Sequence, residues 1–72
     1  MTDYIPDGAV KVIELIGLSE KSFEHALQQA VSKAAETIQG ITDVEVLRQS
    51  ARVKDGAIQQ YRVNVRIAFV VQ

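Results

Sequence analysis

The stretch YRVNVRIAFVV, residues 61–71, decides the fold because its side chains alternate in kind. Its odd positions hold only tyrosine, valine, isoleucine and phenylalanine, all of them large and apolar. Its even positions begin with Arg62, Asn64 and Arg66 before they turn to alanine and valine. A period of two is typical of a β-strand that places one face in a core. The sequence therefore predicts a half-buried strand and leaves open what its arginine face contacts.

A tight turn joins this strand to the one before it. Asp55-Gly56 is a strong hairpin signal, because a two-residue type I′ turn needs positive φ at both of its central positions. We therefore predict strands over 42–53 and 57–72 that pair as an antiparallel hairpin. A further strand over 9–17 is rich in valine and isoleucine, and it is apolar on both faces, which is typical of a strand covered on both sides.

The segment between the first two strands, residues 18–40, is predicted to form an amphipathic helix. Ser19 is expected to be its N-cap, because a serine hydroxyl can accept a hydrogen bond from a free backbone N–H of the first turn. Glu20 then lies where a negative charge suits the helix dipole, and Gly40 is expected to end the helix. The apolar stripe recurs at spacings of three and four residues and comprises Phe23, Ala26, Leu27, Ala30, Val31, Ala34 and Ile38.

The predicted order of elements is β-α-β-β, an α+β fold with a three-stranded antiparallel sheet and one amphipathic helix. We predict a single domain over residues 9–72, preceded by a short tail over residues 1–8 that contains Pro6 and the Asp7-Gly8 pair. One helix can cover only one face of such a sheet. The other face needs a further layer if it is to be buried.

The composition restricts how so small a domain can be stabilised. A chain of 72 residues buries only about 60% of the surface that its unfolded form exposes, so small folds usually need disulfides, a metal ion or a partner chain. The absence of cysteine excludes disulfides and thiolate metal sites, and the single histidine excludes a site with several histidine ligands. Association with further chains is the remaining common means of stabilisation.

The charge and hydropathy patterns argue against two classes of partner. The formal net charge is −1 and no window is strongly basic, whereas a nucleic-acid surface needs clustered lysine and arginine. No segment approaches the roughly 20 consecutive apolar residues that span a bilayer. The first residues, MTDYIPDG, lack the basic and apolar parts of a signal peptide. We therefore expect a soluble, cytoplasmic protein that binds neither nucleic acid nor membrane.

The sequence offers no evident catalytic set, so we predict that the protein is not an enzyme. Nucleophilic catalysis requires a base beside the nucleophile. His25 falls on the polar side of the predicted helix, where a solvated side chain is expected. Ser19, Ser22, Ser32 and Ser50 have no evident partner, and no glycine-rich phosphate loop or paired-histidine motif is present.

A two-residue turn at Asp55-Gly56 fixes which residues of the hairpin face each other, because the numbers of facing residues then sum to 111. One set of pairs should lie on the sheet face without the helix, here called the helix-free face. It comprises Gln49 with Arg62, Leu47 with Asn64, and Glu45 with Arg66. The set predicted to lie under the helix comprises Ser50 with Tyr61, Arg48 with Val63, Val46 with Val65, and Val44 with Ile67.

The helix-free face combines charged and apolar residues. Glu45 opposite Arg66 is a favourable cross-strand pair worth roughly 0.2–1 kcal/mol, and a solvated face with this single ion pair is one interpretation. Apolar residues such as Leu47 interrupt the polar set, however, and a face that mixes arginine with apolar residues is typical of a subunit interface. We therefore predict that Arg62, Asn64 and Arg66 face neighbouring copies of the same chain.

Several stretches together resemble the dodecin family: KVIELIGLSEKSFEHA, the small-residue helix QQAVSKAAETI, the EV of the second strand and the closing YRVNVRIAF. The resemblance covers about residues 9–71. It implies a β-α-β-β fold whose sheet wraps around a single helix, with twelve copies assembled into a hollow shell of 23 symmetry. It also implies flavin storage without catalytic turnover. In flavin-binding dodecins the rings stack between tryptophans of symmetry-related chains, and a glutamine of the last strand hydrogen-bonds the ring.

The resemblance places the ligand site on particular residues of this chain. Asp43 stands at the family's tryptophan position, two residues before Glu45 of the EV motif, and Arg62 stands at the glutamine position. The chain contains no tryptophan, and stacking of a flavin needs a large π face. Asp43, Glu45 and Arg62 are thus the implied ligand positions, with FMN, riboflavin or lumiflavin as the implied ligand. The predicted interface positions are Leu47, Asn64 and Arg66.

Other functions remain open from the sequence. A shell of the same architecture could have lost flavin and hold an ion pair between Asp43 of one chain and Arg62 of the next, binding another anion, a metal ion or nothing. Carboxylates such as Asp43, Glu45 and Asp55 could bind calcium or magnesium between chains. A monomeric or dimeric α+β binding module fits the pattern less well, because the last strand lacks exposed aromatic residues that would stack on bases.

Overall fold

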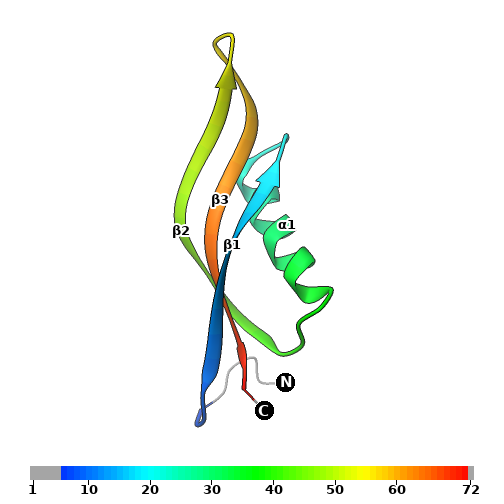
Figure 1. The fold of residues 1–72 in the computed structure, drawn as a ribbon, viewed down its shortest axis with the longest axis vertical. Coiled ribbons are helices and arrows are strands. Elements are labelled where there is room, and N and C mark those ends of the chain that lie inside the picture. Colours follow the sequence, from blue (N-terminus) through cyan, green and yellow to red (C-terminus); the bar gives the residue numbers. More distant parts are fainter. Residues whose placement is uncertain (1–5, 72) are drawn as a thin grey trace.

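The computed structural model describes residues 6–71 and has the predicted order of elements (Figure 1). Strand β1 spans Val10–Ser19, helix α1 Phe23–Ala35, strand β2 Ile41–Lys54 and strand β3 Ala57–Val70. The α+β class and the β-α-β-β order are thereby confirmed. Of the predicted tail, residues 1–5 lie outside the described residues, and residues 6–8 belong to no helix or strand.

The three strands form one antiparallel sheet in the order β1-β3-β2, so β3 lies in the centre. Val63, Val65 and Ile67 are fully buried, with 0% of each residue exposed. Asn64 and Arg66, which alternate with them, are half-buried on the opposite face. The alternation within residues 61–71 therefore gives the central strand one core face, as predicted.

Helix α1 packs closely against the sheet through small side chains. Ala26, Ala30 and Ala34 are buried in one cluster with the apolar side chains of β3, and Phe23, Leu27 and Ile38 pack against this cluster. These six positions of the predicted stripe are thereby confirmed, whereas Val31 is not part of the cluster. Gly17 of β1 faces this stripe, and a Cβ atom there would clash with the carbonyl oxygen of Ala26 and come within 2.9 Å of the Ala30 Cβ. The absence of a side chain at Gly17 thus allows the backbones of β1 and α1 to approach each other.

The helix leaves much of β2 uncovered on the helix side of the sheet (Figure 1). Val44 and Val46 pair with Ile67 and Val65 as predicted, so they lie on the helix side of the sheet. They are nevertheless 37% and 42% exposed, whereas Ile41 of β2 packs against the core. A helix is about 10–12 Å across and does not cover three twisted strands. Both faces of the sheet therefore keep exposed apolar residues.

The predicted start of the helix is wrong. Strand β1 continues through Ser19, which pairs with Tyr61, and the N-cap is Ser22, whose hydroxyl accepts a hydrogen bond from the backbone N–H of His25 at 2.9 Å. The Ser19 hydroxyl accepts the N–H groups of Lys21 at 2.8 Å and of Ser22 at 3.4 Å, and so it closes the turn before the helix. Both serines are good caps by residue type, and strand pairing decides between them.

The predicted end of the helix is also wrong, because α1 stops at Ala35. The N–H groups of Thr37 and Ile38 both donate to the carbonyl of Ala34, at 3.2 and 2.9 Å, which tightens the last turn. Ile38 then packs against the core. Gly40 has a φ of 79° in the loop that follows, so its left-handed conformation serves the entry into β2. No helix within residues 6–71 is long and apolar enough to cross a membrane.

The hairpin turn has the predicted form, but the pairing beyond it is shifted in the middle. Asp55 has a φ of 53° and Gly56 a φ of 78°, as a type I′ turn requires. One extra residue in β3, Gln59, shifts the register by one, and one extra residue in β2, Leu47, shifts it back. A third shift lies at Thr42, near the start of β2. Such single-residue bulges leave no turn signal in the sequence.

The predicted pairs of Val44, Glu45 and Val46 are confirmed, and the predicted pairs between the bulges at Gln59 and Leu47 are wrong. The confirmed pairs are Glu45 with Arg66, Val46 with Val65, and Val44 with Ile67. The observed pairs between the bulges are Arg48 with Asn64, Gln49 with Val63, Ser50 with Arg62, and Ala51 with Tyr61. Arg48 and Ser50 therefore lie on the helix-free face and Gln49 lies on the helix side, the reverse of the prediction. Leu47 is itself the bulged residue and does not face Asn64.

The molecule is elongated, with extents of 50 × 19 × 19 Å. Its radius of gyration is 14.2 Å, whereas a compact domain of this length would have about 11 Å. Its accessible surface is 5437 Å², whereas a compact monomer of its mass would expose about 4,400 Å². The single chain thus exposes more surface than a self-sufficient domain of its size.

Candidate functional site

The helix-free face has a rung of three charged residues, one from each strand. Arg66 of β3 lies between its register partners, Glu14 of β1 and Glu45 of β2. Its Nη2 donates to Glu14 Oε2 at 3.3 Å, and its Nη1 donates to Glu45 Oε1 at 3.4 Å. The carboxylates are largely exposed, so each pair contributes at most about 1 kcal/mol in the isolated chain. The rung nevertheless links all three strands in one register.

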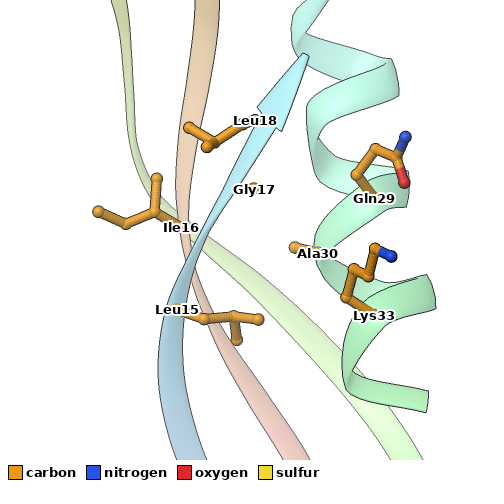
Figure 2. Close-up of a pocket in the computed structure, with 7 residues that line it drawn as sticks. All are labelled: Leu15, Ile16, Gly17, Leu18, Gln29, Ala30 and Lys33. Carbon is orange, nitrogen blue, oxygen red and sulfur yellow. The ribbon is translucent and has the colours of Figure 1, made fainter. Parts of the chain in front are cut away.

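On either side of this rung, β1 presents apolar side chains to solvent. Val10 and Val12 precede Glu14 on this face, Ile16 and Leu18 follow it, and all four are between 47% and 52% exposed. Figure 2 shows Ile16 and Leu18 pointing away from α1. Exposed apolar side chains gathered on one face are typical of a surface that another molecule covers. These four residues are here called the β1 apolar row. They explain why β1 is apolar on the helix-free face as well as on the face toward α1.

The three predicted interface positions lie on or beside the helix-free face. Asn64 and Arg66 are half-buried on this face, where their partners in β1 are Ile16 and Glu14. Leu47 is exposed at the bulge of β2. The contact of these residues with another chain stays a prediction.

Two of the predicted ligand positions, Asp43 and Arg62, do not meet within one chain. Asp43 pairs with Ala68, and its carboxylate accepts a hydrogen bond from the Thr42 hydroxyl at 2.9 Å. Arg62 lies about 20 Å from Ala68 along β3, given a rise of about 3.3 Å per residue. Its Nε donates to Gln60 Oε1 at 3.3 Å. A site that includes both Asp43 and Arg62 would therefore need a second chain.

Sequence reasoning missed four polar residues of the helix-free face. Glu14 reaches this face through the pairing of β1 with β3. These strands are far apart in the sequence, so no hairpin turn indicates their register. Arg48, Ser50 and Arg52 reach it because the bulges shift the register of β2. A signal was available for Arg48: the uniform register would have placed this charge under the helix, where an unpaired guanidinium is costly.

A groove of about 280 Å³ lies between β1 and α1 (Figure 2). In it, Leu15 points toward the helix, and Gly17 leaves room between the two elements. Its lining is mostly apolar and comprises Leu15, Ile16, Gly17, Leu18, Gln29, Ala30 and Lys33. This lining suits an apolar group, but it contains no pair of residues that could act as nucleophile and base.

Ser19 and His25 form a hydrogen-bonded pair that the sequence did not reveal. The Ser19 Oγ lies 2.6 Å from His25 Nδ1, and Ser19 is only 7% exposed. His25 is half-buried, so the expectation of a solvated histidine is wrong. The Ser19 Oγ also accepts the backbone N–H groups of Lys21 and Ser22. A hydroxyl that is buried and bonded in this way closes a turn and is poorly placed to attack a substrate.

The described aromatic side chains lie on the helix side of the sheet. The rings of Phe23 and Tyr61 meet edge to face, with centroids 4.9 Å apart and an interplanar angle of 77°. Phe69 pairs with Lys11 and Ile41 and alternates in step with the buried residues of β3. The helix-free face of residues 6–71 therefore offers no aromatic ring on which a flavin could stack.

Within residues 6–71, no group of three or more histidine, aspartate or glutamate side chains is close enough to hold a metal ion. Asp43 and Glu45 are neighbours on β2, but Asp55 lies in the turn at the other end of this strand. A calcium or magnesium site of the predicted kind would therefore take ligands from more than one chain.

The sequence and the fold both match known proteins. The family model described as Dodecin matches residues 9–72. Calcium dodecin from Mycobacterium tuberculosis is 32% identical over 59 residues, which are 82% of this chain and 83% of that protein. The dodecin of Thermus thermophilus is 29% identical over 59 residues, which are 82% of this chain and 86% of that protein.

Two solved structures show the same fold. Dodecin from Streptomyces coelicolor has a TM-score of 0.89 at 22% identity, with 94% of this chain and 97% of that chain covered. The crystal structure of the M. tuberculosis calcium dodecin, described as calcium chelating with a novel calcium-binding site, has a TM-score of 0.79 at 32% identity. It covers 90% of this chain and 93% of that chain.

Proposed function

The chain belongs to the dodecin family, and from this premise we propose that it forms a non-catalytic, homo-oligomeric shell that binds and stores a small ligand. The proposed assembly is the homododecamer that the family resemblance implies, with the domain of residues 9–72 as its repeating unit. The β1 apolar row is the observation that supports this proposal most directly.

The β1 apolar row favours association with copies of the same chain. Its four side chains are about half exposed, and burial contributes about 25 cal/mol per Å² of apolar surface. The single chain also exposes about 1,000 Å² more than a compact monomer of its mass, which is more than one side of a standard interface. Most soluble oligomers are assemblies of identical chains, and a self-assembling chain covers such a surface without another partner.

A charge placed in the β1 apolar row tests the assembly. We expect Ile16→Lys to lower the molar mass measured by light scattering toward that of the single chain, because a lysine is costly to bury in an interface. Gln28→Lys adds the same charge at an exposed position of α1 and should keep the wild-type mass. Circular dichroism should show that both variants keep their helix. Equal masses for the two variants would argue that the row is not an interface.

Flavin is the first ligand proposed, because it is the ligand that the family resemblance implies. FMN, riboflavin and lumiflavin are the candidates, with Asp43, Glu45 and Arg62 at the corresponding positions. Asp43 offers no π face for stacking, and Arg62 carries a charge where the family has a neutral amide. The alternative is a shell that has lost flavin, holds an ion pair between Asp43 and Arg62 of different chains, and binds another anion, a metal ion or nothing.

Fluorescence titration distinguishes these two versions. Riboflavin bound in the proposed site should lose fluorescence at micromolar protein concentration. Unchanged fluorescence at high protein concentration would exclude flavin storage but would not contradict the oligomeric shell. The double variant Asp43→Trp with Arg62→Gln restores the family's residues and should gain riboflavin affinity. No gain in the double variant would mean that the pocket itself differs from that of flavin-binding dodecins.

Calcium is the metal ion that the alternative favours, because the relative from M. tuberculosis is named calcium dodecin. In this version the carboxylates of Asp43 and Glu45 on neighbouring chains would supply the oxygen ligands, in place of the ion pair between Asp43 and Arg62. Calorimetric titration with Ca²⁺ after treatment with a chelator should show binding that Asp43→Asn weakens. Glu36→Gln, on the exposed helix surface beside Lys33, should leave binding unchanged. Absence of heat in the wild-type protein would exclude this version.

A further inference from the structure

The end of the β2–β3 hairpin extends beyond β1 and α1 without a covering layer (Figure 1). Strand β1 ends at Ser19, which pairs with Tyr61, and α1 begins at Phe23, whose ring meets that of Tyr61. Residues 52–60 beyond this level, here called the hairpin arm, therefore form a two-stranded ribbon. A two-stranded hairpin is at best marginally stable by itself in water, so the arm needs a further contact.

The helix side of the hairpin arm is apolar. Val53 lies two positions after Ala51, which pairs with Tyr61 of the core side, and Ile58 is the partner of Val53. Val53 and Ile58, here called the tip pair, are 59% and 54% exposed, more than any residue of the β1 apolar row. They lie on the opposite face of the sheet from that row. A molecule that covers the β1 apolar row therefore leaves the tip pair exposed.

We propose that the tip pair of one chain lies in the groove between β1 and α1 of a neighbouring copy. The inference rests on the proposed function, because it names the surfaces through which the copies of the shell meet. The groove has a volume of about 280 Å³ and a mostly apolar lining (Figure 2). An apolar cavity of about 150 Å³ holds a benzene ring, so the groove has room for two branched aliphatic side chains.

The charges of the two surfaces are complementary. The described lining of the groove contains one charged residue, Lys33, and the end of the arm carries Asp55, two residues after Val53. Lys33 pairs with Glu36 at 3.5 Å, and both side chains are more than 60% exposed, so this pair contributes little. The Lys33 ammonium group can therefore also contact the Asp55 carboxylate of the chain whose arm enters the groove.

A shell of identical chains needs two different contacts. One type of contact repeats a single rotation, so by itself it gives a closed ring or an open filament. The β1 apolar row provides one contact on the helix-free face. The tip pair and the groove provide another on the helix side, where an exposed apolar group of one copy meets an apolar hollow of the next. A second copy is thus the occupant that satisfies the arm and the groove together.

Paired cysteine variants of the full-length protein test this contact, because the chain contains no cysteine of its own. Val53→Cys with Gln29→Cys places one thiol on the tip pair and one in the groove lining. Mild oxidation should link neighbouring chains covalently, as seen on a denaturing gel without reductant. A disulfide needs Cα atoms within about 7 Å of each other. Val53→Cys alone should give no such link, and neither should Val53→Cys with Gln28→Cys, an exposed position outside the lining.

Light scattering of Val53→Lys gives a second measurement. We expect a mass below that of the wild type, because a lysine is costly to bury in an apolar groove. Gln28→Lys adds the same charge to the exposed face of α1 and should keep the wild-type mass. Circular dichroism should show an intact helix in both variants.

The outcomes separate this inference from the proposed function. An intact wild-type oligomer whose paired cysteines give no more linked product than Val53→Cys alone would overturn the contact and leave the shell. A wild-type mass for Val53→Lys would also overturn the contact, because the charge would then lie in solvent. Wild-type protein that is monomeric in light scattering, with no linked product from the paired cysteines, would overturn the contact and the shell together.

Discussion

Gly17 shows how a single residue sets the distance between the helix and the sheet. It lies in β1 opposite Val63 and directly under the backbone of α1 at Ala26. Backbone atoms cannot move aside as the end of a flexible side chain can. The small residues Gly17, Ala26 and Ala30 therefore act together, and a larger group at any of them would force the two elements apart.

We predict that Gly17→Ala lowers the free energy of unfolding by about 1–3 kcal/mol, the range typical of overpacking. Gly56→Ala is the comparison, because nothing lies within 4 Å of a Cβ atom there. Its cost should be confined to about 1 kcal/mol of backbone strain at positive φ. Urea unfolding of both variants at one protein concentration measures the difference. A smaller effect at Gly17 than at Gly56 would contradict the close packing of α1 on β1.

Ser19 is the second residue whose role is local and testable. We predict that Ser19→Ala lowers the free energy of unfolding by about 1–3 kcal/mol, because it leaves His25 Nδ1 and the N–H of Lys21 without their partner. Ser32→Ala is the matched control, since its described hydrogen bond, with Gln28, is exposed, and it should change stability by less than about 0.5 kcal/mol. Thermal unfolding of the two variants gives the comparison, and equal stabilities would argue against the turn-closing role of Ser19.

At the scale of the elements, periodicity and turn chemistry predict the fold well and the boundaries poorly. The spacing of Ala26, Ala30 and Ala34 indicates the buried side of the helix, and Asp55-Gly56 indicates the turn. The helix begins at Phe23, later than predicted, because pairing of Ser19 with β3 extends the preceding strand. That pairing joins residues far apart in the sequence, so the local preferences for N-cap residues could not predict it.

The site positions that local sequence signals determine were predictable, and those that depend on bulges or long-range strand pairing were not. The pair of Glu45 with Arg66 was predictable because the two bulges cancel before the register reaches it. Positions between the bulges, such as Arg48 and Ser50, were not predictable by counting from the turn, because one inserted residue reverses the faces of those that follow. Glu14 required the register of β1 against β3, which two segments far apart in the sequence determine together.

The charged rung of the helix-free face gives a prediction at this scale. We expect Arg66→Gln to lower the free energy of unfolding by more than Lys33→Gln does, because it leaves the carboxylates of Glu14 and Glu45 on either side of an uncharged residue. Lys33→Gln removes a single exposed pair with Glu36, worth about 0.3–0.5 kcal/mol. Urea unfolding should show the difference shrink as salt is raised. A difference that is absent at low salt would contradict the rung.

At the scale of the whole molecule, the chain has the shape of a component of a larger assembly. Its radius of gyration is 14.2 Å, against about 11 Å for a compact domain of equal length. One helix covers part of one sheet face, and the β1 apolar row lies on the other. The sequence predicted this incompleteness from one amphipathic helix and a strand that is apolar on both faces. It did not predict that β2 would also expose Val44 and Val46 on the helix side.

Native mass spectrometry of protein purified without added ligand tests the central claim most directly, because it counts subunits and detects any retained small molecule. The chain has a mass of 7.9 kDa. Coverage of the helix-free face by identical chains predicts one dominant oligomer that persists on dilution, and the dodecin resemblance implies that it has twelve subunits. A folded single chain of 7.9 kDa at low micromolar concentration, with the secondary structure intact, would contradict it.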